Sequence, residues 1–372
     1  MWAQMDIKAA VAIAPDKPFN VKTVQLGNPR ENEILVKIKG VGICHTDLVA
    51  KAGMLPPPHP SVLGHEGSGI VEKIGSAVTS VTVGDHVVLS FSSCRQCSRC
   101  ISDSPAYCEN FVPLNIMGTR TDGSNTITDR GNVVSAHFFG QSSFATFALT
   151  NESNTIKVDK DLPIELLGPL GCGIQTGAGT IMKALACEEG SSVAIYGGGS
   201  VGLSAILGAV VQKCSIIILI EPMVSRRQLA LSLGATHVID PGAKDVEISI
   251  KEICEVGVNY GFDSTGASSV IETAIATLAP RGELALVGTS NPESTPPTFD
   301  PTAILEGKKI RGIIEGEVDP LSFIPLMLDH YKKGNFPFDR LITTYPFEQI
   351  NEAIDAQYRG ECVKPVLVVE GS

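Results

Sequence analysis

The sequence is poor in charge and has no long apolar run. Only 19% of its 372 residues are charged, and 40 acidic side chains outnumber 29 basic ones, for a net charge of -11. A nucleic-acid surface needs clustered Lys and Arg, so this balance disfavours nucleic-acid binding. Apolar runs such as residues 214–220 are far shorter than the ~20 residues that span a bilayer. We therefore expect neither nucleic acid nor a membrane among the partners.

Targeting and low-complexity features are also missing. Residues 1–6 show no charged leader followed by an apolar stretch, so we expect no secretory signal, a cytoplasmic location and reduced thiols. The 37 glycines and 23 prolines are spread along the chain, without a repeat or a biased tract. With 43% hydrophobic residues, the chain is long enough to bury two separate cores.

Two patterns divide the chain. Up to about residue 155, short β-branched runs broken by Gly, Pro and Ser predict an all-β portion. From about residue 175, strands alternate with helices, which predicts a parallel sheet covered on both faces. Strands are predicted at 34–38, 70–74, 86–89, 193–196, 216–220, 237–239, 260–263, 284–287 and 366–369, and helices from the glycine turn to 211 and at 227–234, 269–278 and 323–332. We expect the C-terminal tail to return to the first domain.

Four cysteines are spaced as metal ligands. Cys94, Cys97, Cys100 and Cys108 follow the pattern C-x2-C-x2-C-x7-C, in which two-residue gaps turn successive thiolates inward and the longer gap brings the chain back. Four sulfurs fill a tetrahedral zinc site and leave no place for water. The spacing therefore predicts a closed, structural zinc site, so the chemistry has to be sought elsewhere.

A glycine-rich turn lies between a predicted strand and a predicted helix. Residues 197–202 read G-G-G-S-V-G and contain G-x-G-x-x-G, in which Gly197 permits the tight turn, Gly199 lets a pyrophosphate approach, and Gly202 lets the helix pack closely. Ser200 and Val201 open the helix, whose N-terminus favours the pyrophosphate. This context predicts a dinucleotide-binding loop.

An acidic residue follows this loop at the expected distance. Glu221 lies nineteen residues after Gly202, at the end of the second predicted strand. A carboxylate there accepts hydrogen bonds from the adenosine ribose and repels a 2′-phosphate, so NAD is favoured over NADP. The neighbouring Arg226 and Arg227 weaken that preference slightly, and Arg226 is included among the predicted cofactor contacts.

Three further segments are rich in ligand types and flanked by glycine. Cys44, His65 and Cys172 supply a Cys2His set, which suits a catalytic zinc that keeps its fourth position open. Asp47 could orient His65 through its other ring nitrogen, and Glu66 could lie beside the metal to tune its charge or act as a transient ligand. Taken alone, the large separation of Cys44 and Cys172 leaves open that they are ordinary core thiols. The other cysteines, Cys187, Cys214, Cys254 and Cys362, are interpreted as buried small hydrophobes.

Together, these segments resemble the zinc-dependent medium-chain alcohol dehydrogenase family from Gly42 to Lys364. In that family G-x-C-x-[ST]-D supplies a zinc cysteine and a proton-relay hydroxyl, here Cys44 and Thr46, while G-H-E and G-C-G supply His65 and Cys172. The resemblance implies a GroES-like β-rich catalytic domain, 1–177 completed by 318–372, and a Rossmann doubly wound parallel-sheet domain, 178–317. It also implies two zinc ions per chain and NAD.

The resemblance implies hydride transfer between NAD(H) and a primary alcohol or aldehyde. Thr46 would take the alcohol proton, and His45 or water would complete the relay, because Val49 stands where many relatives have a histidine. By similarity, His45 and Lys364 would contact the cofactor pyrophosphate; a surface lysine is the alternative for Lys364. The remaining histidines, among them His137, are interpreted as surface or core residues.

Residues 139–145 and 168–177 most resemble the aryl and allylic alcohol dehydrogenases of the benzyl alcohol type. The stretches 52–56 and 111–113 carry no charge, unlike the charged pocket of glutathione-dependent formaldehyde dehydrogenases. Three alternatives stay open: an enzyme of that glutathione-dependent type, a biosynthetic enzyme with a specialised substrate, and a non-catalytic cofactor-binding protein. The resemblance also implies a homodimer, because family members with a similarly long stretch between Cys108 and Phe138 are commonly dimers. Local matching predicts a substrate pocket of Leu55, Phe91, Phe138, Thr289 and Ile314.

Overall fold

The computed structural model describes residues 4–289 and 294–369, which divide into two compact units. The first unit holds the described chain up to Cys172, then Asp319–Pro325 and the chain from Leu341 onward, and the second holds Gly173–Val318 and Leu326–Arg340. The domains implied by the family resemblance differ from these units, because they end the first segment at residue 177 and assign all of 318–372 to the catalytic domain.

Local packing explains both differences from the predicted boundaries. Gly177 lies so close to helix α5 that an added Cβ would stand 2.0 Å from the carbonyl oxygen of Val201, which places the segment after Cys172 in the second unit. Arg340 donates from its guanidinium to the carbonyl and hydroxyl oxygens of Ser232, both at 2.9 Å, which places the end of 326–340 there too.

The first unit is built on two sheets. The five-stranded sheet has the order β4-β1-β2-β7-β8, and the seven-stranded sheet has the order β10-β6-β5-β3-β18-β17, with β9 also paired to β3. The strands are β1 Met5–Ala12, β2 Asn20–Leu26, β3 Glu33–Gly42, β4 Ser61–Val62, β5 Gly67–Ile74, β6 His86–Leu89, β7 Ile127–Asp129, β8 Asn132–Val134, β9 Phe147–Asn151, β10 Thr155–Val158, β17 Ile342–Pro346 and β18 Lys364–Val368. The C-terminal β18 lies antiparallel to β3, with Val366 opposite Gly42, so the tail does return to this unit.

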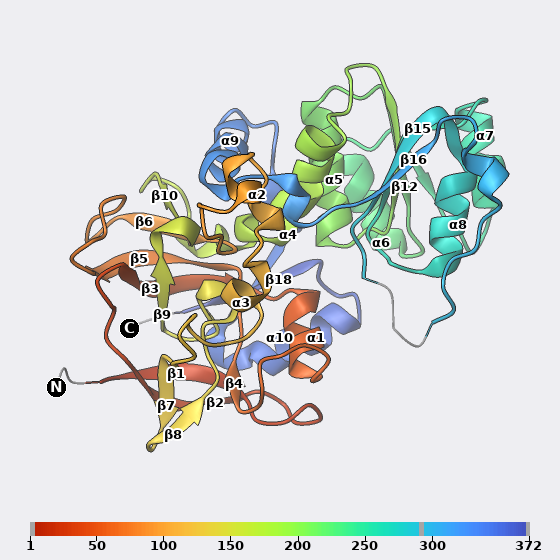
Figure 1. The fold of residues 1–372 in the computed structure, drawn as a ribbon. Coiled ribbons are helices and arrows are strands. Elements are labelled where there is room, and N and C mark those ends of the chain that lie inside the picture. Colours follow the sequence, from red (N-terminus) through yellow and green to blue (C-terminus); the bar gives the residue numbers. More distant parts are fainter. Residues whose placement is uncertain (1–3, 290–293, 370–372) are drawn as a thin grey trace. The chain divides into compact units, whose positions relative to one another are not determined.

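The second unit is a six-stranded parallel sheet in the order β13-β12-β11-β14-β15-β16. This is the order 3-2-1-4-5-6 of a Rossmann fold, which binds ligands at the carboxyl ends of the strands where the order reverses. The strands are β11 Ser192–Tyr196, β12 Ile216–Ile220, β13 His237–Ile239, β14 Val258–Asp263, β15 Leu278–Leu286 and β16 Lys309–Gly312. Within this unit, Figure 1 shows α5 and α6 on one side of the sheet and α7 and α8 on the other, as the alternating pattern predicts.

Helices are mostly short in the first unit and longer in the second. The α-helices are α1 His45–Lys51, α2 Ser98–Ile101, α3 Phe111–Asn115, α4 Gly173–Gly179, α5 Ser200–Val211, α6 Val224–Ser232, α7 Val246–Ile253, α8 Ser268–Ala276, α9 Pro320–Lys332 and α10 Ile350–Tyr358. The sequence pattern predicts no helix at the position of α7, although Asp245 caps this helix by accepting a hydrogen bond from the Ile248 N–H at 2.9 Å. Among the residues that the structure describes, no helix combines the length and apolar character needed to cross a membrane.

Candidate active site

The four predicted structural-zinc cysteines converge in the first unit. Zinc–sulfur bonds of about 2.3 Å in a tetrahedron place the sulfurs about 3.8 Å apart. The sulfurs of Cys97 and Cys100 are 3.5 Å apart, and those of Cys94 and Cys100, and of Cys97 and Cys108, are 4.0 Å apart. The backbone N–H groups of Cys97 and Asn110 donate to Cys94 and Cys108 sulfurs at 3.4 Å, which favours thiolates. The donor set therefore fits a closed tetrahedral zinc.

The proposed catalytic ligands are held by the start of helix α1 and the loop before β5. Asp47, in the first turn of α1, is fully buried. Its Oδ2 accepts a hydrogen bond from the backbone N–H of Cys44 at 3.1 Å, while its Oδ1 accepts from Gly64 N at 3.0 Å and lies 2.9 Å from His65 Nδ1. One carboxylate thus fixes the positions of a cysteine and a histidine that are twenty-one residues apart in sequence.

These contacts leave the other ring nitrogen of His65 facing a cluster of ligand atoms. Nε2 of His65 is buried and has no hydrogen-bond partner. One ligand atom each from Cys44, His65, Glu66 and Cys172 lie within 4.8 Å of one another. An unpartnered imidazole nitrogen beside two sulfurs is the donor set of a Cys2His zinc site. The structure therefore brings together the three residues that the sequence alone could not join.

The electrostatics of this cluster favour the thiolate of Cys44 and, without a metal, the protonated form of His65. The neighbouring sulfur of Cys172 contributes most to holding the pKa of Cys44 well below its usual value, and the contribution of His65 helps to outweigh burial. Burial opposes a charge on His65, but Asp47 and Cys44 hold its pKa well above the usual value. Zinc binding requires a thiolate and would compete with a proton for the imidazole nitrogen.

Glycines flank the ligands because neighbouring atoms leave no room for a side chain. A Cβ at Gly42 would stand 2.0 Å from Glu66 Oε2, and a Cβ at Gly171 would stand 1.9 Å from the carbonyl oxygen of Leu89. Gly64 combines a φ of +91° with a Cβ position only 2.4 Å from the Phe144 nitrogen. The glycine flanks noted in the sequence are therefore requirements of close packing around the site.

Lys364 lies inside the molecule, so its interpretation as a surface lysine is wrong. It is 1% exposed, and its ammonium lies 2.9 and 3.0 Å from the two carboxylate oxygens of Glu66 and 3.0 Å from the carbonyl oxygen of Ile43. These three acceptors match its three N–H donors. Burial raises the pKa of Glu66 to about 7, although Lys364 opposes this shift. In the first unit, Lys364 is thus a partner of Glu66; the predicted contact with pyrophosphate stays a prediction.

Phe139 and Gln141 support His65, and the sequence pattern gives neither of them a role. The Phe139 ring stacks on the imidazole with centroids 4.5 Å apart, and Phe138 meets it edge-on at 5.7 Å. Gln141 donates to the carbonyl oxygen of His65 at 2.9 Å and accepts from the N–H of Gly67 at 3.1 Å. Both lie in the segment 139–145, whose family resemblance was the available signal.

The other predicted residues of the zinc centre also lie on α1. The hydroxyl of Thr46 is 3.8 Å from the sulfur of Cys44 and is half-buried, and His45 is exposed at the first position of the helix. Of the predicted substrate pocket, Leu55, Phe91 and Phe138 belong to the first unit, and Thr289 and Ile314, both exposed, belong to the second. The complete pocket stays a prediction.

In the second unit the glycine loop has the predicted form. Gly197 has a φ of +98°, and a Cβ at Gly202 would stand 1.8 Å from the carbonyl oxygen of Gly197, so the helix can approach only without a side chain there. Gly199 caps helix α5, and no atom lies within 4 Å of its Cβ position. Open space at the N-terminus of a twelve-residue helix suits a pyrophosphate.

Glu221 lies directly beside this loop. Its Oε2 accepts from the Gly198 N–H at 2.6 Å and its Oε1 from the Met223 N–H at 2.9 Å, and the residue is 3% exposed. Arg227 forms an ion pair with Asp240 at 2.9 Å and donates to the Glu221 carbonyl oxygen at 2.7 Å. Arg226 is half-buried, and its Nε has no partner. The guanidinium of Arg227 is therefore already paired within the protein, and Arg226 is the other cation close to Glu221 in sequence.

The remaining cysteines only partly match their interpretation. All ten cysteines are free thiols, and Cys187, Cys214 and Cys362 are buried, but Cys254 is half-exposed. Cys187 and Cys214 are not isolated core thiols, since a hydrogen bond between them raises the pKa of Cys187 and lowers that of Cys214 to about 7. Their pairing joins residues from separate segments and has no sequence signal.

Comparison with known proteins places the chain in a family. The sequence model of the alcohol dehydrogenase GroES-like domain matches residues 30–160, and that of the zinc-binding dehydrogenase matches 200–332. Geraniol dehydrogenase of Castellaniella defragrans is 48% identical over 97% of both chains. The crystal structure of benzyl alcohol dehydrogenase from Acinetobacter calcoaceticus is 44% identical, with a TM-score of 0.95 over 98% of this chain and 99% of that one. A "Probable S-(hydroxymethyl)glutathione dehydrogenase 1" of Schizosaccharomyces pombe is 33% identical over 97% of this chain and 96% of its own.

The chain therefore belongs to the zinc-dependent medium-chain alcohol dehydrogenases. It is an oxidoreductase of small-molecule alcohols, with a GroES-like domain and a Rossmann-like domain, as the resemblance implied. The intact ligand set and the family membership argue against a non-catalytic cofactor-binding protein.

Proposed function

We propose that this protein oxidises primary allylic and aryl alcohols to aldehydes with NAD. The observation that carries the reaction type is the buried cluster of Cys44, His65 and Cys172 with an unpartnered Nε2 aimed into it. The relatives named geraniol and benzyl alcohol dehydrogenases support the substrate class, because they match almost the whole chain at 48% and 44% identity. The relative named as a glutathione dehydrogenase is more distant, at 33%.

Residues of the first unit would divide the work at this site. Cys44, His65 and Cys172 would hold zinc, a Lewis acid that lowers the pKa of an alcohol at its open position. The half-buried hydroxyl of Thr46, 3.8 Å from the Cys44 sulfur, would accept the alcohol proton. His45, exposed on the same helix, would release it to solvent in place of the histidine that Val49 replaces.

Residues of the second unit would hold the cofactor. The N-terminus of α5, from Gly199 to Val201, would bind the pyrophosphate through backbone N–H groups. Glu221 still has unused lone pairs on its two oxygens, so it could accept hydrogen bonds from the adenosine ribose while repelling a 2′-phosphate. The commitment of Arg227 to Asp240 removes one cation that NADP would need.

A metal and substrate assay tests this proposal. We expect two zinc ions per chain, and NAD reduction faster with geraniol, cinnamyl alcohol or benzyl alcohol than with short aliphatic alcohols. Cys172→Ser should lose one zinc and all turnover while the protein stays folded. Cys254→Ser, at a half-exposed thiol of the second unit, is the matched control and should keep both. Turnover limited to S-(hydroxymethyl)glutathione, or one zinc in the unchanged protein, would contradict the proposal.

We further propose that the enzyme is a cytoplasmic homodimer. Ten free thiols suit a reducing compartment. A solution mass near twice 39.2 kDa by light scattering would support the dimer, and a monomer or a tetramer would refute it.

A further inference from the structure

A buried side-chain amide bonds to the backbone around His65. Gln141, which is 2% exposed, donates from its NH2 group to the carbonyl oxygens of His65 and Ser90 at 2.9 and 3.2 Å. Its oxygen accepts from the Gly67 N–H at 3.1 Å and from the Ser143 hydroxyl at 2.9 Å. A side-chain amide can donate twice and accept twice, so all four of its bonding positions are used.

The side chain of Ser90 continues this network toward Cys172. Its hydroxyl is fully buried and donates to the carbonyl oxygen of Gly171 at 2.6 Å. That carbonyl is part of the planar peptide group that joins Gly171 to Cys172, so the hydrogen bond restricts how this peptide group can turn. Gln141 and Ser90 thus form a link, the amide–serine bridge, from one proposed ligand to the residue before another.

The backbone of Ser90 is held by a residue outside the metal centre. Its N–H donates to the carbonyl oxygen of Asn154 at 3.0 Å, and the side chain of Asn154 donates back to the Ser90 carbonyl oxygen at 3.3 Å. Asn154 is fully buried as well. Ser90 directly follows strand β6, so it is a fixed point between the two ligand segments.

The segments that carry the two ligands also pack directly against each other. A Cβ at Gly168 would stand 2.1 Å from the carbonyl oxygen of Glu66, and a Cβ at Gly67 would stand 2.7 Å from the Cβ of Ser143. Such close packing transmits a shift of one segment to the other. Packing alone leaves a peptide group some freedom to turn, whereas a hydrogen bond has a direction and fixes it.

Two polar bridges together connect the three proposed zinc ligands. The carboxylate of Asp47 joins Cys44 to His65. The amide–serine bridge joins His65 to the residue before Cys172. Both bridges are buried, and a hydrogen bond is stronger in such surroundings than in water. The ligand geometry is therefore built by directional bonds before a metal arrives.

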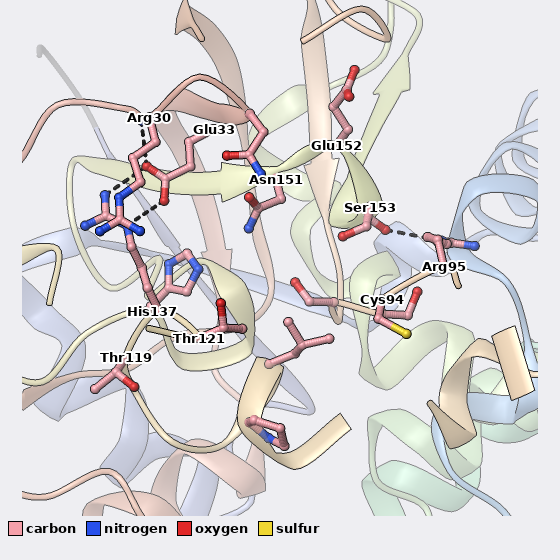
Figure 2. A pocket seen from close by; sticks show the side chains of 16 residues that line it. Arg30, Glu33, Cys94, Arg95, Thr119, Thr121, His137, Asn151, Glu152 and Ser153 are labelled. Atoms are coloured by element: carbon pink, nitrogen blue, oxygen red, sulfur yellow. Dashed lines mark hydrogen bonds and ion pairs between the residues drawn. The ribbon is translucent and has the colours of Figure 1, made fainter. Parts of the chain in front are cut away.

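The amide–serine bridge does not border the pocket shown in Figure 2. This pocket of the first unit has a volume of about 320 Å³, and His137 is part of its lining. Neither Ser90 nor Gln141 lines it. The hydrogen bonds of the bridge run between groups of the protein, so a ligand of this pocket does not account for them.

We propose that Gln141 and Ser90 are positioning residues of the catalytic metal site, which set the Cys172 thiolate relative to the His65 ring. The proposal rests on the proposed function, because it takes the cluster of Cys44, His65 and Cys172 to hold zinc. The two residues act through the backbone of the ligands and touch neither metal nor alcohol. A tetrahedral ion needs its ligands within narrow limits of distance and angle, so a site fixed in advance binds metal more tightly.

Visible absorption of the cobalt-loaded full chain tests the proposal. Zinc has a filled d shell and no such absorption, whereas the bands of tetrahedral cobalt respond to ligand geometry. Cobalt is loaded at both sites, and the four-cysteine site contributes equally in all variants. Ser90→Ala removes the hydroxyl that holds Gly171 and should shift the bands of the catalytic site. In chelator competition it should lower the affinity for one zinc by about tenfold, the lower end for groups that orient ligands.

A second variant perturbs the other end of the amide–serine bridge. Gln141→Glu keeps the oxygen that accepts from Gly67 and Ser143 but places a second oxygen against the carbonyl oxygens of His65 and Ser90. It should also shift the cobalt bands and weaken the binding of one zinc. A response of Gln141→Glu without one of Ser90→Ala would confine the effect to His65 and overturn the proposal.

Ser135→Ala is the matched control. Ser135 is buried in the same unit, and its hydroxyl also donates to a glycine carbonyl oxygen, that of Gly118, at 3.0 Å; in the described part of the chain it bonds to no proposed zinc ligand. Its loss should lower the melting temperature, as Ser90→Ala does, but leave the cobalt bands and both zinc affinities unchanged.

Two outcomes separate a failure of this proposal from a failure of the proposed function. If Ser90→Ala is less stable but has the cobalt bands and zinc affinities of Ser135→Ala, the bridge serves stability only and the proposal falls, while two zinc ions and turnover in the unchanged protein keep the proposed function. One zinc ion in the unchanged protein would overturn both.

Discussion

Replacement of Asp47 by asparagine should loosen the catalytic zinc without unfolding the protein. The carboxylate of Asp47 has only donors around it, because it accepts from Cys44 N at 3.1 Å and from Gly64 N at 3.0 Å and faces His65 Nδ1 at 2.9 Å. An asparagine retains one oxygen. Its less costly orientation keeps that oxygen toward His65 and Gly64 and turns the NH2 group toward the N–H of Cys44.

The magnitude follows from this donor–donor contact. Leaving a buried donor unsatisfied costs about 1–3 kcal/mol. Loss of a carboxylate that orients a ligating histidine typically lowers metal affinity about 10–100-fold, equivalent to about 1.4–2.7 kcal/mol. The two estimates agree, so Asp47→Asn should lower catalytic-zinc affinity within that range and leave the four-cysteine zinc untouched.

Chelator competition measures the effect. Zinc per chain is followed against EDTA concentration, and we expect one zinc of Asp47→Asn to leave at least tenfold earlier than in the unchanged protein. Asp85→Asn is the control, because Asp85 is also buried and accepts from the Thr82 N–H at 2.9 Å, but it is hydrogen-bonded to no proposed zinc ligand in the structure described. It should lower stability and leave both zinc midpoints in place. Equal midpoints for Asp47→Asn and the unchanged protein would refute the reasoning.

Three further predictions concern single residues. Lys364→Met leaves Glu66 buried without its cation and should lower the free energy of unfolding by about 3–5 kcal/mol in urea, with most of the loss restored by adding Glu66→Gln; a loss below about 1 kcal/mol would contradict the pairing. Glu221→Ser removes a carboxylate beside the loop and should move the NAD to NADP ratio of kcat/KM toward NADP by about tenfold or more; an unchanged ratio would assign the preference to other groups. Burial lowers the pKa of His137 in the folded protein to about 4, so only the unfolded chain binds a proton at this histidine as the pH falls through 6.5. The free energy of unfolding should therefore fall by up to about 3 kcal/mol between pH 6.5 and pH 4. His137→Asn should show a correspondingly flatter dependence of stability on pH, and a dependence identical to that of the unchanged protein would refute this assignment.

Local patterns were sufficient where ligands are close in sequence. The spacing of Cys94, Cys97, Cys100 and Cys108 predicted a closed metal site, and their sulfurs are 3.5–4.0 Å apart in the pairs given above. The loop 197–202 predicted a strand, turn and helix that the structure contains. In both cases the geometry depends on a few backbone turns, which neighbouring residues determine.

Long-range packing decided what sequence spacing could not. Cys44 and Cys172 could be read as core thiols until β3, β6 and β18 placed them around His65. Lys364 is 298 residues from Glu66, and only the pairing of β18 with β3 buries its ammonium against that carboxylate. A buried charge has no local signal, because its cost and its compensation both arise from groups that tertiary contacts bring together.

The sequence by itself determined the family, the two kinds of domain and the chemical type of each ligand, since these depend on residue identity and short spacing. Tertiary structure alone decided that Asp47 joins two proposed ligands and that His65 keeps one nitrogen unpartnered. Hydrogen-bond satisfaction is a property of the folded neighbourhood, because donors and acceptors far apart in the chain meet only after the strands have paired.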